Sequence, residues 1–340
     1  MKIDLNMNRM LTEAEAKRIY TRYLKKEQTA LDIAKDLNIP LDEVLGLVDV
    51  LSHYWYFIDV EEIDDDIVIT KSRKKNYAID KKVKPPIEEC KKVTLGVVSD
   101  THLCCKDQQL HMLNSAYKYF YEHYITTVLH CGDISDGDFT NKRKLQIYNL
   151  FMHGTDEQAD YIEEMYPRVN GITTYFIQGN HDETHKINGG GSVGPAIARS
   201  RKDMIYCGQD HYDYIDKTTK VKIRMRHPGG GISKYKSRNL QNTIDSMPSG
   251  NKPKLLLEGH YHKSYYFIYR NVHAILVPAL CCQSAFMEKK DLANIMGFYD
   301  IDIYADEKGN VQYITPREHL FDESQVKKDD WRKTKRLVIK

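Results

Sequence analysis

Residues 97–102 read Val-Val-Ser-Asp-Thr-His, the end of an apolar run followed by an Asp-x-His pair. The run begins at Val93 and ends at Val98, and its length and residue types predict a buried strand. Asp100 and His102 would follow the carboxyl end of that strand, which is where open α/β sheets place their ligands.

Four later segments repeat this pattern, because each is a β-like run that stops at a polar loop. The four loops carry Gly132-Asp133, Gly179-Asn180-His181-Asp182, His227 and Gly259-His260-Tyr261-His262. We interpret the five strand ends together as one metal site assembled from five loops.

Length and composition limit the class of protein. A chain of 340 residues with 41% hydrophobic content is larger than one ordinary domain and can bury a sizeable core. The net charge of +2 argues neither for nor against nucleic acid. No run approaches the roughly 18 apolar residues of a membrane span, and Met1–Asn6 lacks the apolar core of a signal peptide. We therefore expect a cytoplasmic protein, in a bacterium or a phage-infected host cell, with no membrane partner.

The seven cysteines form no C-x-x-C pair. We expect reduced, mostly buried thiols, as is usual for a cytosolic protein. Cys104 and Cys105 follow the Asp-x-His pair closely, so a role near the metals is the alternative.

Residues 1–70 are predicted to form a small winged-helix-like domain. Two short amphipathic helices around Leu37-Asn38-Ile39-Pro40 resemble a helix-turn-helix, and a hairpin between about Phe57 and Thr70 would be the wing. The second helix, from Leu41 to about His53, carries acidic residues and no Lys or Arg. Because a recognition helix meets phosphates with positive charge, we favour dimerisation or protein docking over DNA binding.

The remaining boundaries follow from composition. Residues 71–90 are a basic linker that contains Pro85-Pro86, and a solvated connector and a nucleic-acid contact both stay open for it. Residues 91–318 carry the strand, loop and helix pattern, and residues 319–340 form a charged tail that we expect to be a loose surface helix.

The strand-end side chains that can bind metal are all oxygen or imidazole donors: Asp100, His102, Asp133, Asn180, His227, His260 and His262. This mixture suits Mn, Fe, Zn or Ni and disfavours a Cys-type structural zinc site. The number of donors exceeds what one ion needs, so two ions that share a carboxylate are expected.

The ordered set Asp-x-His, Gly-Asp, Gly-Asn-His-Asp, His and Gly-His-x-His, over about residues 92–315, resembles the calcineurin-like metallophosphoesterase superfamily. The resemblance implies an α/β (α+β) fold, a four-layer β-sandwich flanked by helices. The layout with a helix-turn-helix-like N-terminal domain also resembles phage- and prophage-encoded members.

By this resemblance the first metal is held by Asp100, His102 and His262, and the second by Asn180, His227 and His260. Asp133 is the implied bridge between them. His181, oriented by Asp136, is the implied general acid for the departing oxygen. Gly137 stands where the protein serine/threonine phosphatases have a phosphate-gripping arginine, which argues against that branch.

The segment after His227 is the expected approach for substrate. Its glycines, Gly229 to Gly231, would admit a bulky molecule. Three basic side chains there either grip phosphate or form a solvated helix face: Lys234, Lys236 and Arg238.

The favoured function is a dinuclear, manganese-preferring phosphodiesterase that acts on nucleic acid as a nuclease. The alternatives are a phosphodiesterase or phosphatase for small nucleotides, and a DNA- or protein-binding regulator with a scaffold domain. The intact ligand set speaks against the regulator. The sequence leaves open the native substrate, endo- or exonuclease action, the physiological metal, and a homo-oligomer formed through the N-terminal domain.

Overall fold

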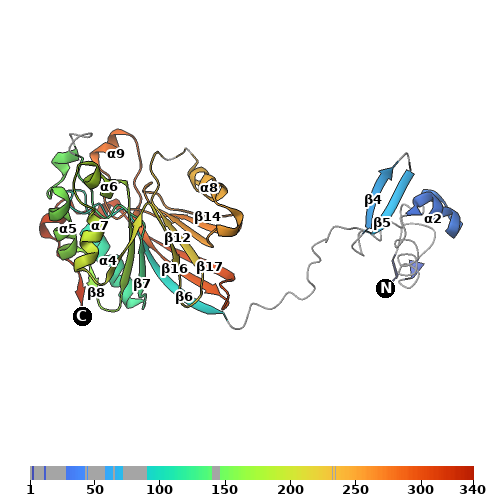
Figure 1. The fold of residues 1–340 in the computed structure, drawn as a ribbon, viewed down its shortest axis with the longest axis horizontal. Helices are drawn as coiled ribbons and strands as arrows, with labels where there is room; N and C mark the ends of the chain where they lie inside the picture. The colour runs from blue at the N-terminus through green and yellow to red at the C-terminus, as the bar shows by residue number, and fades with distance from the viewer. Residues whose placement is uncertain are drawn as a thin grey trace. The chain divides into compact units, whose positions relative to one another are not determined.

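The computed structural model describes residues 2–3, 11–12, 28–42, 44, 58–63, 66–71, 90–139, 146–231, 233 and 235–340. The chain divides into two compact units, Met1–Pro85 and Pro86–Lys340 (Figure 1). No helix among these residues has the length and apolar content needed to cross a membrane.

The first unit contains one described helix and a small sheet. Helix α2, Ala30–Leu37, is capped at its N-terminus by Thr29, whose hydroxyl accepts a hydrogen bond from the Asp32 backbone N–H at 3.1 Å. Its C-cap is Asn38, which has a left-handed conformation. Strands β3 (Gln28–Thr29), β5 (Asp66–Lys71) and β4 (Ile58–Ile63) form an antiparallel sheet, and β1 (Lys2–Ile3) pairs with β2 (Leu11–Thr12).

The helix at Ala30–Leu37 and the hairpin of β4 and β5 confirm two of the predicted elements. Most of the second predicted helix, from Leu41 to about His53, and most of the basic linker lie outside the described residues. The winged-helix interpretation and the exact domain limits therefore stay predictions.

The second unit contains two large sheets and one two-stranded sheet among its described residues. The six-stranded sheet has the order β10 (Met204–Gln209), β9 (Thr173–Gln178), β7 (Thr127–His130), β6 (Lys91–Val98), β16 (Met296–Ala305) and β17 (Val311–Phe321). The five-stranded sheet has the order β11 (His211–Ile215), β12 (Lys222–Arg226), β13 (Leu255–Glu258), β15 (Val272–Leu276) and β14 (Tyr265–Tyr269). The neighbours β10, β9, β7 and β6 are parallel, as are β12, β13 and β15.

One hydrophobic core joins the facing sides of the two sheets. Leu95 and Val97 of β6 point into it, and Ile223 and Met225 of β12 enter the same core from the other sheet. This is the period of two that a strand imposes on its side chains. Burying each such aliphatic side chain stabilises the folded state by roughly 1.5–3 kcal/mol relative to leaving it exposed to water.

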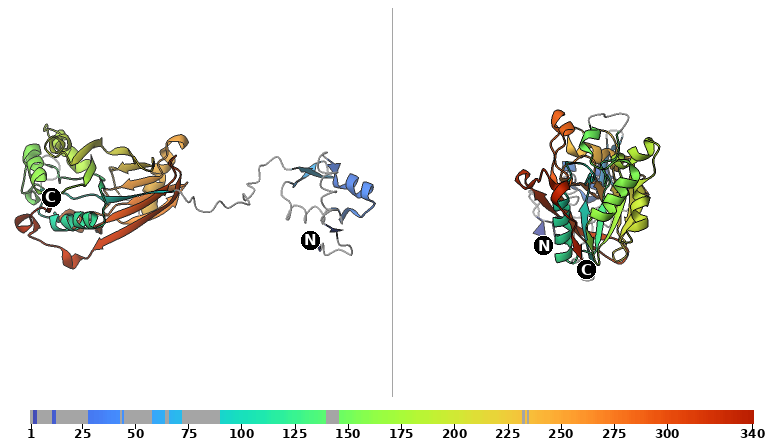
Figure 2. Two further views of the ribbon diagram at one scale, coloured as in Figure 1. Left: turned by 90° about the horizontal axis from the view of Figure 1, so that it is seen from below. Right: turned by 90° about the vertical axis from the view of Figure 1, so that its left-hand side faces the viewer.

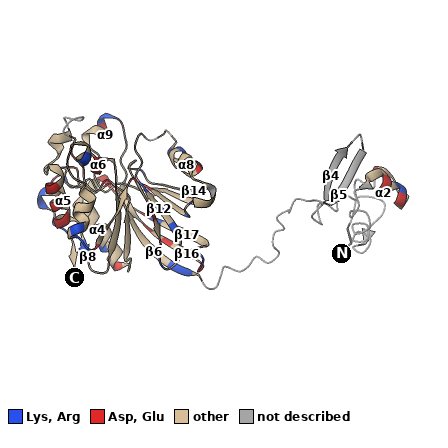
Figure 3. Ribbon diagram, in the orientation of Figure 1, with Lys and Arg blue, Asp and Glu red and all other residues tan. Residues whose placement is uncertain are grey.

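Helices cover the outer sides of both sheets (Figures 1 and 2). Helices α4 (Leu110–Glu122), α5 (Gly154–Met165) and α7 (Val193–Ser200) share a core with the six-stranded sheet, and α8 (Lys236–Ser246) packs on the five-stranded sheet. Charged residues mark the outer helices α5 and α8 (Figure 3). The predicted four layers are confirmed.

Shorter elements complete the unit: η1 (Gln146–Asn149), β8 (Arg168–Val169), α6 (Asn180–Ile187), η2 (Ser249–Asn251), α9 (Ala285–Lys289), η3 (Glu323–Gln325), α10 (Asp330–Lys333) and β18 (Val338–Ile339).

The C-terminal tail differs from the expected loose helix. Strand β17 continues to Phe321, beyond the expected limit at residue 318. Helix α10 has only four residues, and β18 pairs in parallel with β8. Asp330 is 1% exposed. The tail is therefore docked against the unit by backbone pairing and by one buried carboxylate.

Candidate metal centre

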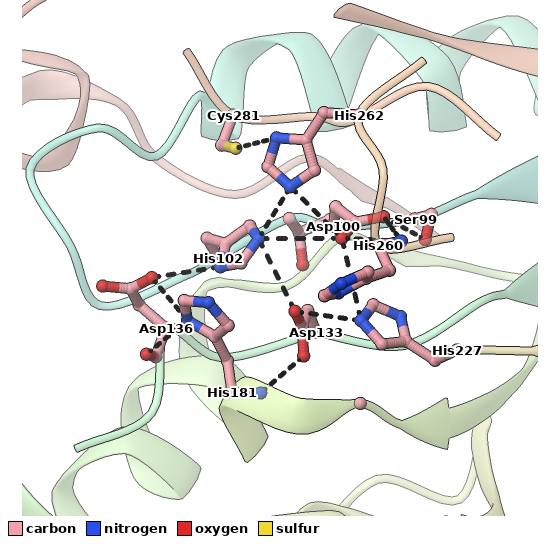
Figure 4. A network of polar contacts seen from close by, with 12 residues as sticks. Ser99, Asp100, His102, Asp133, Asp136, His181, His227, His260, His262 and Cys281 are labelled. Atoms are coloured by element: carbon pink, nitrogen blue, oxygen red, sulfur yellow. Dashed lines mark hydrogen bonds and ion pairs between the residues drawn. The ribbon is translucent and has the colours of Figure 1, made fainter. Parts of the chain in front are cut away.

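The predicted ligands come from loops at the carboxyl ends of five strands. Asp100 and His102 follow β6, Asp133 follows β7, Asn180 begins α6 after β9, His227 follows β12, and His260 and His262 follow β13. Figure 4 shows the carboxylates and imidazoles of both sheets pointing toward one another. The structure therefore brings together residues that lie up to 162 positions apart, by the numbering of Asp100 and His262.

The donors divide into two clusters with one shared member. Asp100, His102 and Asp133 place one ligand atom each within 4.8 Å of one another, and so do Asp133, His227 and His260. His262 joins the first cluster, because its Nε2 lies 3.3 Å from Oδ1 of Asp100. Asp133 is common to both clusters, which is the place predicted for the bridging carboxylate.

In each carboxylate one oxygen takes the shorter hydrogen bonds from the protein and the other is directed into the site, with Oδ1 of Asp100 sharing the His260 backbone N–H at 3.2 Å. Oδ2 of Asp100 accepts hydrogen bonds from the Ser99 hydroxyl at 2.6 Å and the His260 backbone N–H at 2.9 Å. Oδ1 of Asp133 accepts the backbone N–H of His181 at 2.8 Å. The other Asp133 oxygen lies 3.0 Å from Nε2 of His227 and 3.9 Å from Nε2 of His102.

Oxygen acceptors fix which ring nitrogen of three histidines carries a proton. Nδ1 of His102 faces a carboxylate oxygen of Asp136 at 3.0 Å, and Nδ1 of His227 faces the Cys131 carbonyl at 2.7 Å. In His260 it is Nε2 that faces the Gly230 carbonyl, at 2.6 Å. A carbonyl or carboxylate oxygen can only accept, so the opposite nitrogen of each ring is left as a lone-pair donor for a metal.

His102 and His262 give the clearest case for a bound cation. Nδ1 of His262 faces the side-chain oxygen of Asn294 at 2.8 Å, so both rings have their proton at Nδ1. Their Nε2 atoms are only 3.2 Å apart. Two lone pairs at that distance, beside Oδ1 of Asp100, repel one another unless a proton or a metal ion lies among them.

The electrostatics of the site favour positive charge. Burial by itself would lower the pKa of His227, but the charges of Asp133 and Asp100 raise it to about 9. Burial lowers the pKa of His102, but hydrogen bonds that its ring donates to the carboxylates of Asp100 and Asp136 raise it well above its usual value. Burial would raise the pKa of Asp100, yet the charges of His262 and His227 hold it well below its usual range. The same negative field that attracts protons attracts divalent cations.

Two further observations fit a metal. Among the described side chains, Oδ1 of Asn180 is buried without a hydrogen-bond partner, and Nε2 of His227 is buried with no hydrogen bond of good geometry, although an Asp133 oxygen lies 3.0 Å away. The glycines beside the ligands leave no room for a side chain: a Cβ at Gly132 would lie 2.3 Å from Nδ1 of His227, and one at Gly179 would lie 2.3 Å from Oδ1 of Asp133. The residues present therefore fit a dinuclear centre with oxygen and imidazole ligands.

His181 and Asp136 lie beside the first cluster. Nδ1 of His181 is 3.0 Å from the Asp136 carbonyl and 3.1 Å from its carboxylate. The ring of His181 also meets His102 edge-on at 4.5 Å between centroids, and Phe139 at 4.7 Å. Asp136 thus contacts two histidines, His102 and His181, where the sequence led us to expect only the second.

Asp182, which the sequence motif contains but to which we gave no role, ties two of the loops together. Its carboxylate accepts the backbone N–H groups of Ile134, Ser135 and Gly179 at 3.2, 2.9 and 2.9 Å. Burial and the nearby charge of Asp133 raise its pKa to about 6. This carboxylate fixes the loop that follows β7 against the loop that follows β9.

Two of the three predicted substrate-binding residues are described. Lys236 and Arg238 are exposed in the first turn of α8, whereas Lys234 lies outside the described residues. Helix α8 is joined to the site by Asn239, whose side-chain amide donates to the Gly231 carbonyl at 3.2 Å and to the Tyr261 hydroxyl at 2.7 Å. Burial and the positive charge of Lys236 lower the pKa of Lys263, which follows His262 directly.

The sequence analysis missed two neighbours of His262. Asn294 has no motif around it and lies 32 residues beyond the histidine that it contacts. The sulfur of Cys281 lies 4.0 Å from Nδ1 of His262, and burial raises the pKa of its thiol well above the usual value. Cys104 and Cys105, which we considered near the metals, are buried free thiols.

The fold and this donor set define a metal-dependent phosphoesterase. The model of the calcineurin-like phosphoesterase superfamily domain matches residues 93–281. The chain belongs to that superfamily, and so to a class of hydrolases with a dinuclear metal site.

A search of solved structures found matches at low sequence identity to this chain. An archaeal phosphodiesterase is 16% identical over 67% of this chain and 100% of its own, with a TM-score of 0.39. Vps29 of Entamoeba histolytica, complexed with zinc, is 13% identical over 68% and 100%, with a TM-score of 0.33. A candidate 5′-nucleotidase from Staphylococcus aureus is 10% identical over 71% and 57%, with a TM-score of 0.40. No curated protein matches the sequence.

Proposed function

We propose that this phosphoesterase is a manganese-preferring phosphodiesterase whose substrate is nucleic acid. The proposal of hydrolysis rests on one observation: the two clusters share Asp133. Hydrogen bonds also fix which ring nitrogen is unprotonated in each of the four histidines of the site. The mixed oxygen and imidazole donors suit Mn²⁺. Two divalent ions held there would activate a water molecule and neutralise charge on a phosphoryl group.

The residues of the chain supply orientation and a proton. Nδ1 of His181 faces two oxygen acceptors of Asp136, so its proton is held there and Nε2 is the free nitrogen. The Asp136 carboxylate stabilises the ring when it is cationic, and Nε2–H can then be donated to the departing oxygen of the diester. The hydrogen bond from the His181 backbone N–H to the Asp133 carboxylate holds His181 close to the carboxylate that the two clusters share.

Basic side chains at the same site support a polyanionic substrate. Lys236 and Arg238 are exposed on the helix that contacts the Gly229–Gly231 segment, and Lys263 follows a metal ligand. A nucleic acid presents phosphates on both sides of the one that is cleaved, and each would meet positive charge here. A Cβ on Gly229, Gly230 or Gly231 would meet no atom of the described residues within 4 Å, so the described part of the chain leaves this approach open.

The experiment is cleavage by the full chain, stripped of metal and then supplied with Mn²⁺. The substrates are single- and double-stranded DNA, RNA, cyclic nucleotides, an aryl diester and an aryl monoester. We expect cleavage of DNA or RNA, with loss of activity in Asp133→Asn. Turnover of small diesters or monoesters alone would overturn the nucleic-acid assignment and favour a small-nucleotide enzyme. No turnover with Mn²⁺, Fe²⁺, Zn²⁺ or Ni²⁺ would overturn the enzymatic assignment itself.

A further inference from the structure

The segment that contains α9 closes over the loop of His262. The backbone N–H of Ile295 donates to the His262 carbonyl at 3.0 Å, and the Lys263 ammonium donates to the Ala293 carbonyl. Within residues 283–295, Asn294 supplies the one side-chain hydrogen bond to the His262 ring among those of the described residues. The segment therefore approaches the metal centre through one polar side chain.

The orientation of Asn294 follows from its second contact. Its amide nitrogen donates to the Cys281 carbonyl at 2.9 Å. A carbonyl can only accept, so the NH₂ group of Asn294 must face Cys281 and its oxygen must face Nδ1 of His262. That oxygen in turn can only accept, which places the ring proton of His262 on Nδ1 and leaves Nε2 bare.

We infer that Asn294 is a positioning residue of the first metal site: it fixes the tautomer and the ring orientation of His262, and so sets the affinity for one of the two ions. The inference rests on the proposed function only through the metal centre and is independent of the substrate. Partners of this kind typically change metal affinity by about 10- to 100-fold when they are removed.

His262 needs such a partner more than the other histidine ligands. His227 and His260 are oriented by backbone carbonyls, and His102 by the Asp136 carboxylate. His262 has a neutral amide on a segment far along the chain, and its Nε2 must be held against Nε2 of His102 at 3.2 Å. Without the acceptor at Nδ1, the proton can move to Nε2 and occupy the position of the ion.

The test compares Asn294→Leu, which keeps the size of the side chain but removes both hydrogen bonds, with Asn294→Asp, which keeps an acceptor for Nδ1. Gln283→Ala is the matched control, because Gln283 donates to the Leu292 carbonyl at 2.8 Å within the same segment and does not contact His262. Calorimetric titration of the metal-stripped full chain with Mn²⁺ measures both sites, and thermal melting verifies that each variant is folded.

We expect Asn294→Leu to weaken one of two Mn²⁺ sites by about 10- to 100-fold, while Asn294→Asp and Gln283→Ala stay within a few-fold of the parent. Proton–nitrogen correlation NMR of the Zn²⁺-loaded protein should show a His262 Nδ1–H that Asn294→Leu loses. Unchanged Mn²⁺ affinity in Asn294→Leu, or an equal loss in Gln283→Ala, would overturn the inference. Failure to cleave nucleic acid would leave these binding results as they are, so the two proposals fail separately.

Discussion

Individual ligand residues are held in backbone conformations that most side chains avoid. Asp100, His102, Asp133, His260 and His262 have φ values of 51°, 40°, 52°, 77° and 50°. A residue in the left-handed region costs on the order of 1–3 kcal/mol and persists only when its surroundings fix it. Here hydrogen bonds and close packing fix it, and the result is a set of side chains that turn back from the strand ends toward one point.

Gly179 gives the first prediction, because a methyl group there would enter the metal centre. Its Cβ would lie 2.3 Å from Oδ1 of Asp133 and 2.5 Å from Cδ2 of His227. We expect Gly179→Ala to destabilise the protein by about 1–3 kcal/mol and to weaken Mn²⁺ binding, as measured by denaturant unfolding and calorimetric titration. Gly229→Ala is the control, since a Cβ there would meet no atom of the described residues within 4 Å. Equal effects of the two substitutions would show that the close approach at Gly179 has no role.

His181 gives a second prediction, which concerns the leaving group. If this residue donates a proton to the departing oxygen, His181→Ala should slow hydrolysis of an alkyl diester by about 10²- to 10⁴-fold. An aryl diester should be slowed much less, because an aryloxide leaves without a proton. Metal content should stay unchanged, which separates the acid from the ligands. The measurement is kcat for the two substrates, and an equal loss with both would contradict the role.

At the residue scale the sequence predicted the donors and missed what orients them. Each candidate ligand follows the end of a strand by only a few residues, so a local sequence pattern is enough to show it. Asn294 orients His262 from a segment 32 residues away, through tertiary packing alone. Backbone carbonyls such as that of Gly230 have no side-chain identity to read. The candidate ligands could therefore be collected from the sequence, whereas the ring tautomers required the structure.

Among the elements, helix α4 depends on a residue from the far end of the chain. Its own N-cap, Gln109, makes no side-chain capping bond. Instead the Asp330 carboxylate accepts the backbone N–H groups of Leu110 at 2.8 Å and His111 at 3.0 Å, and also meets Nδ1 of His111 at 2.7 Å. A charged acceptor at a helix N-terminus satisfies the unpaired N–H groups and the helix dipole together. The charged tail is therefore part of the helical layer.

This cap predicts a pH-dependent stability. Burial would raise the pKa of Asp330, but hydrogen bonds from His111 and Leu110 lower it below the usual value. A carboxyl with a depressed folded-state pKa stabilises the protein above its unfolded pKa of about 3.9 and loses that contribution as the pH falls through the folded value. We expect Asp330→Asn to cost about 1 kcal/mol near pH 7, and the difference from the parent to vanish in strong acid.

Urea unfolding at a series of pH values measures this difference. Asp329→Asn is the control, because Asp329 is exposed and, among the ion pairs of the described residues, its carboxylate pairs only with the exposed Lys333. We expect it to change stability by a few tenths of a kcal/mol at most. A difference for Asp330→Asn that persists unchanged below the folded pKa would contradict the proposed charge dependence.

The elements that the sequence analysis missed are short helices beside the site. Residues 188–192 contain the glycine run Gly189 to Gly191, but α6 ends directly before them, at Ile187, and α7 begins directly after them, at Val193. Each has eight residues, too few to be stable by propensity alone. Val193 and Ile197 are buried in the core against the six-stranded sheet. Packing therefore forms this helix, and a local pattern interrupted by glycines does not show it.

At the scale of the whole molecule, the metal centre joins the two sheets. Asp100, His102, Asp133 and Asn180 belong to strand ends of the six-stranded sheet, and His227, His260 and His262 to those of the five-stranded sheet. The hydrophobic core between the sheets brings the ligands together, and bound ions would in turn hold the sheets in register. Site and fold are therefore thermodynamically linked in the second unit.

This linkage predicts that Mn²⁺ stabilises the second unit as a whole. A ligand that binds only the folded state adds about 2.7 kcal/mol when its concentration is 100 times its Kd. We expect Mn²⁺ to raise the melting temperature of the transition of residues 86–340 in scanning calorimetry of the full chain. Asp133→Asn, which removes the shared ligand, should lose most of that shift. An equal shift in the parent and the variant would place the stabilising Mn²⁺ elsewhere.

The final prediction concerns nucleic-acid binding by the whole chain. The basic residues proposed to contact phosphate lie in two places, the first turn of α8 and the linker of residues 71–90. Each phosphate contact adds about −0.7 to −0.9 to the slope of log affinity against log salt. Replacing both Lys236 and Arg238 by Ala should reduce that slope by about 1 to 2, whereas Lys217→Ala, in the turn before β12 and at the opposite end of that strand from His227, should not.

The linker is tested in the same titration. Replacing Lys81, Lys82 and Lys84 by Gln should reduce the salt slope further if the basic linker contacts the phosphates, because counterion release counts contacts wherever they lie. The same variant should hydrolyse an aryl diester at the parent rate, since a small substrate reaches only the metal centre. A slope that neither set of substitutions changes would mean that binding does not depend on these charges, and the small-nucleotide alternative would then account better for the intact site.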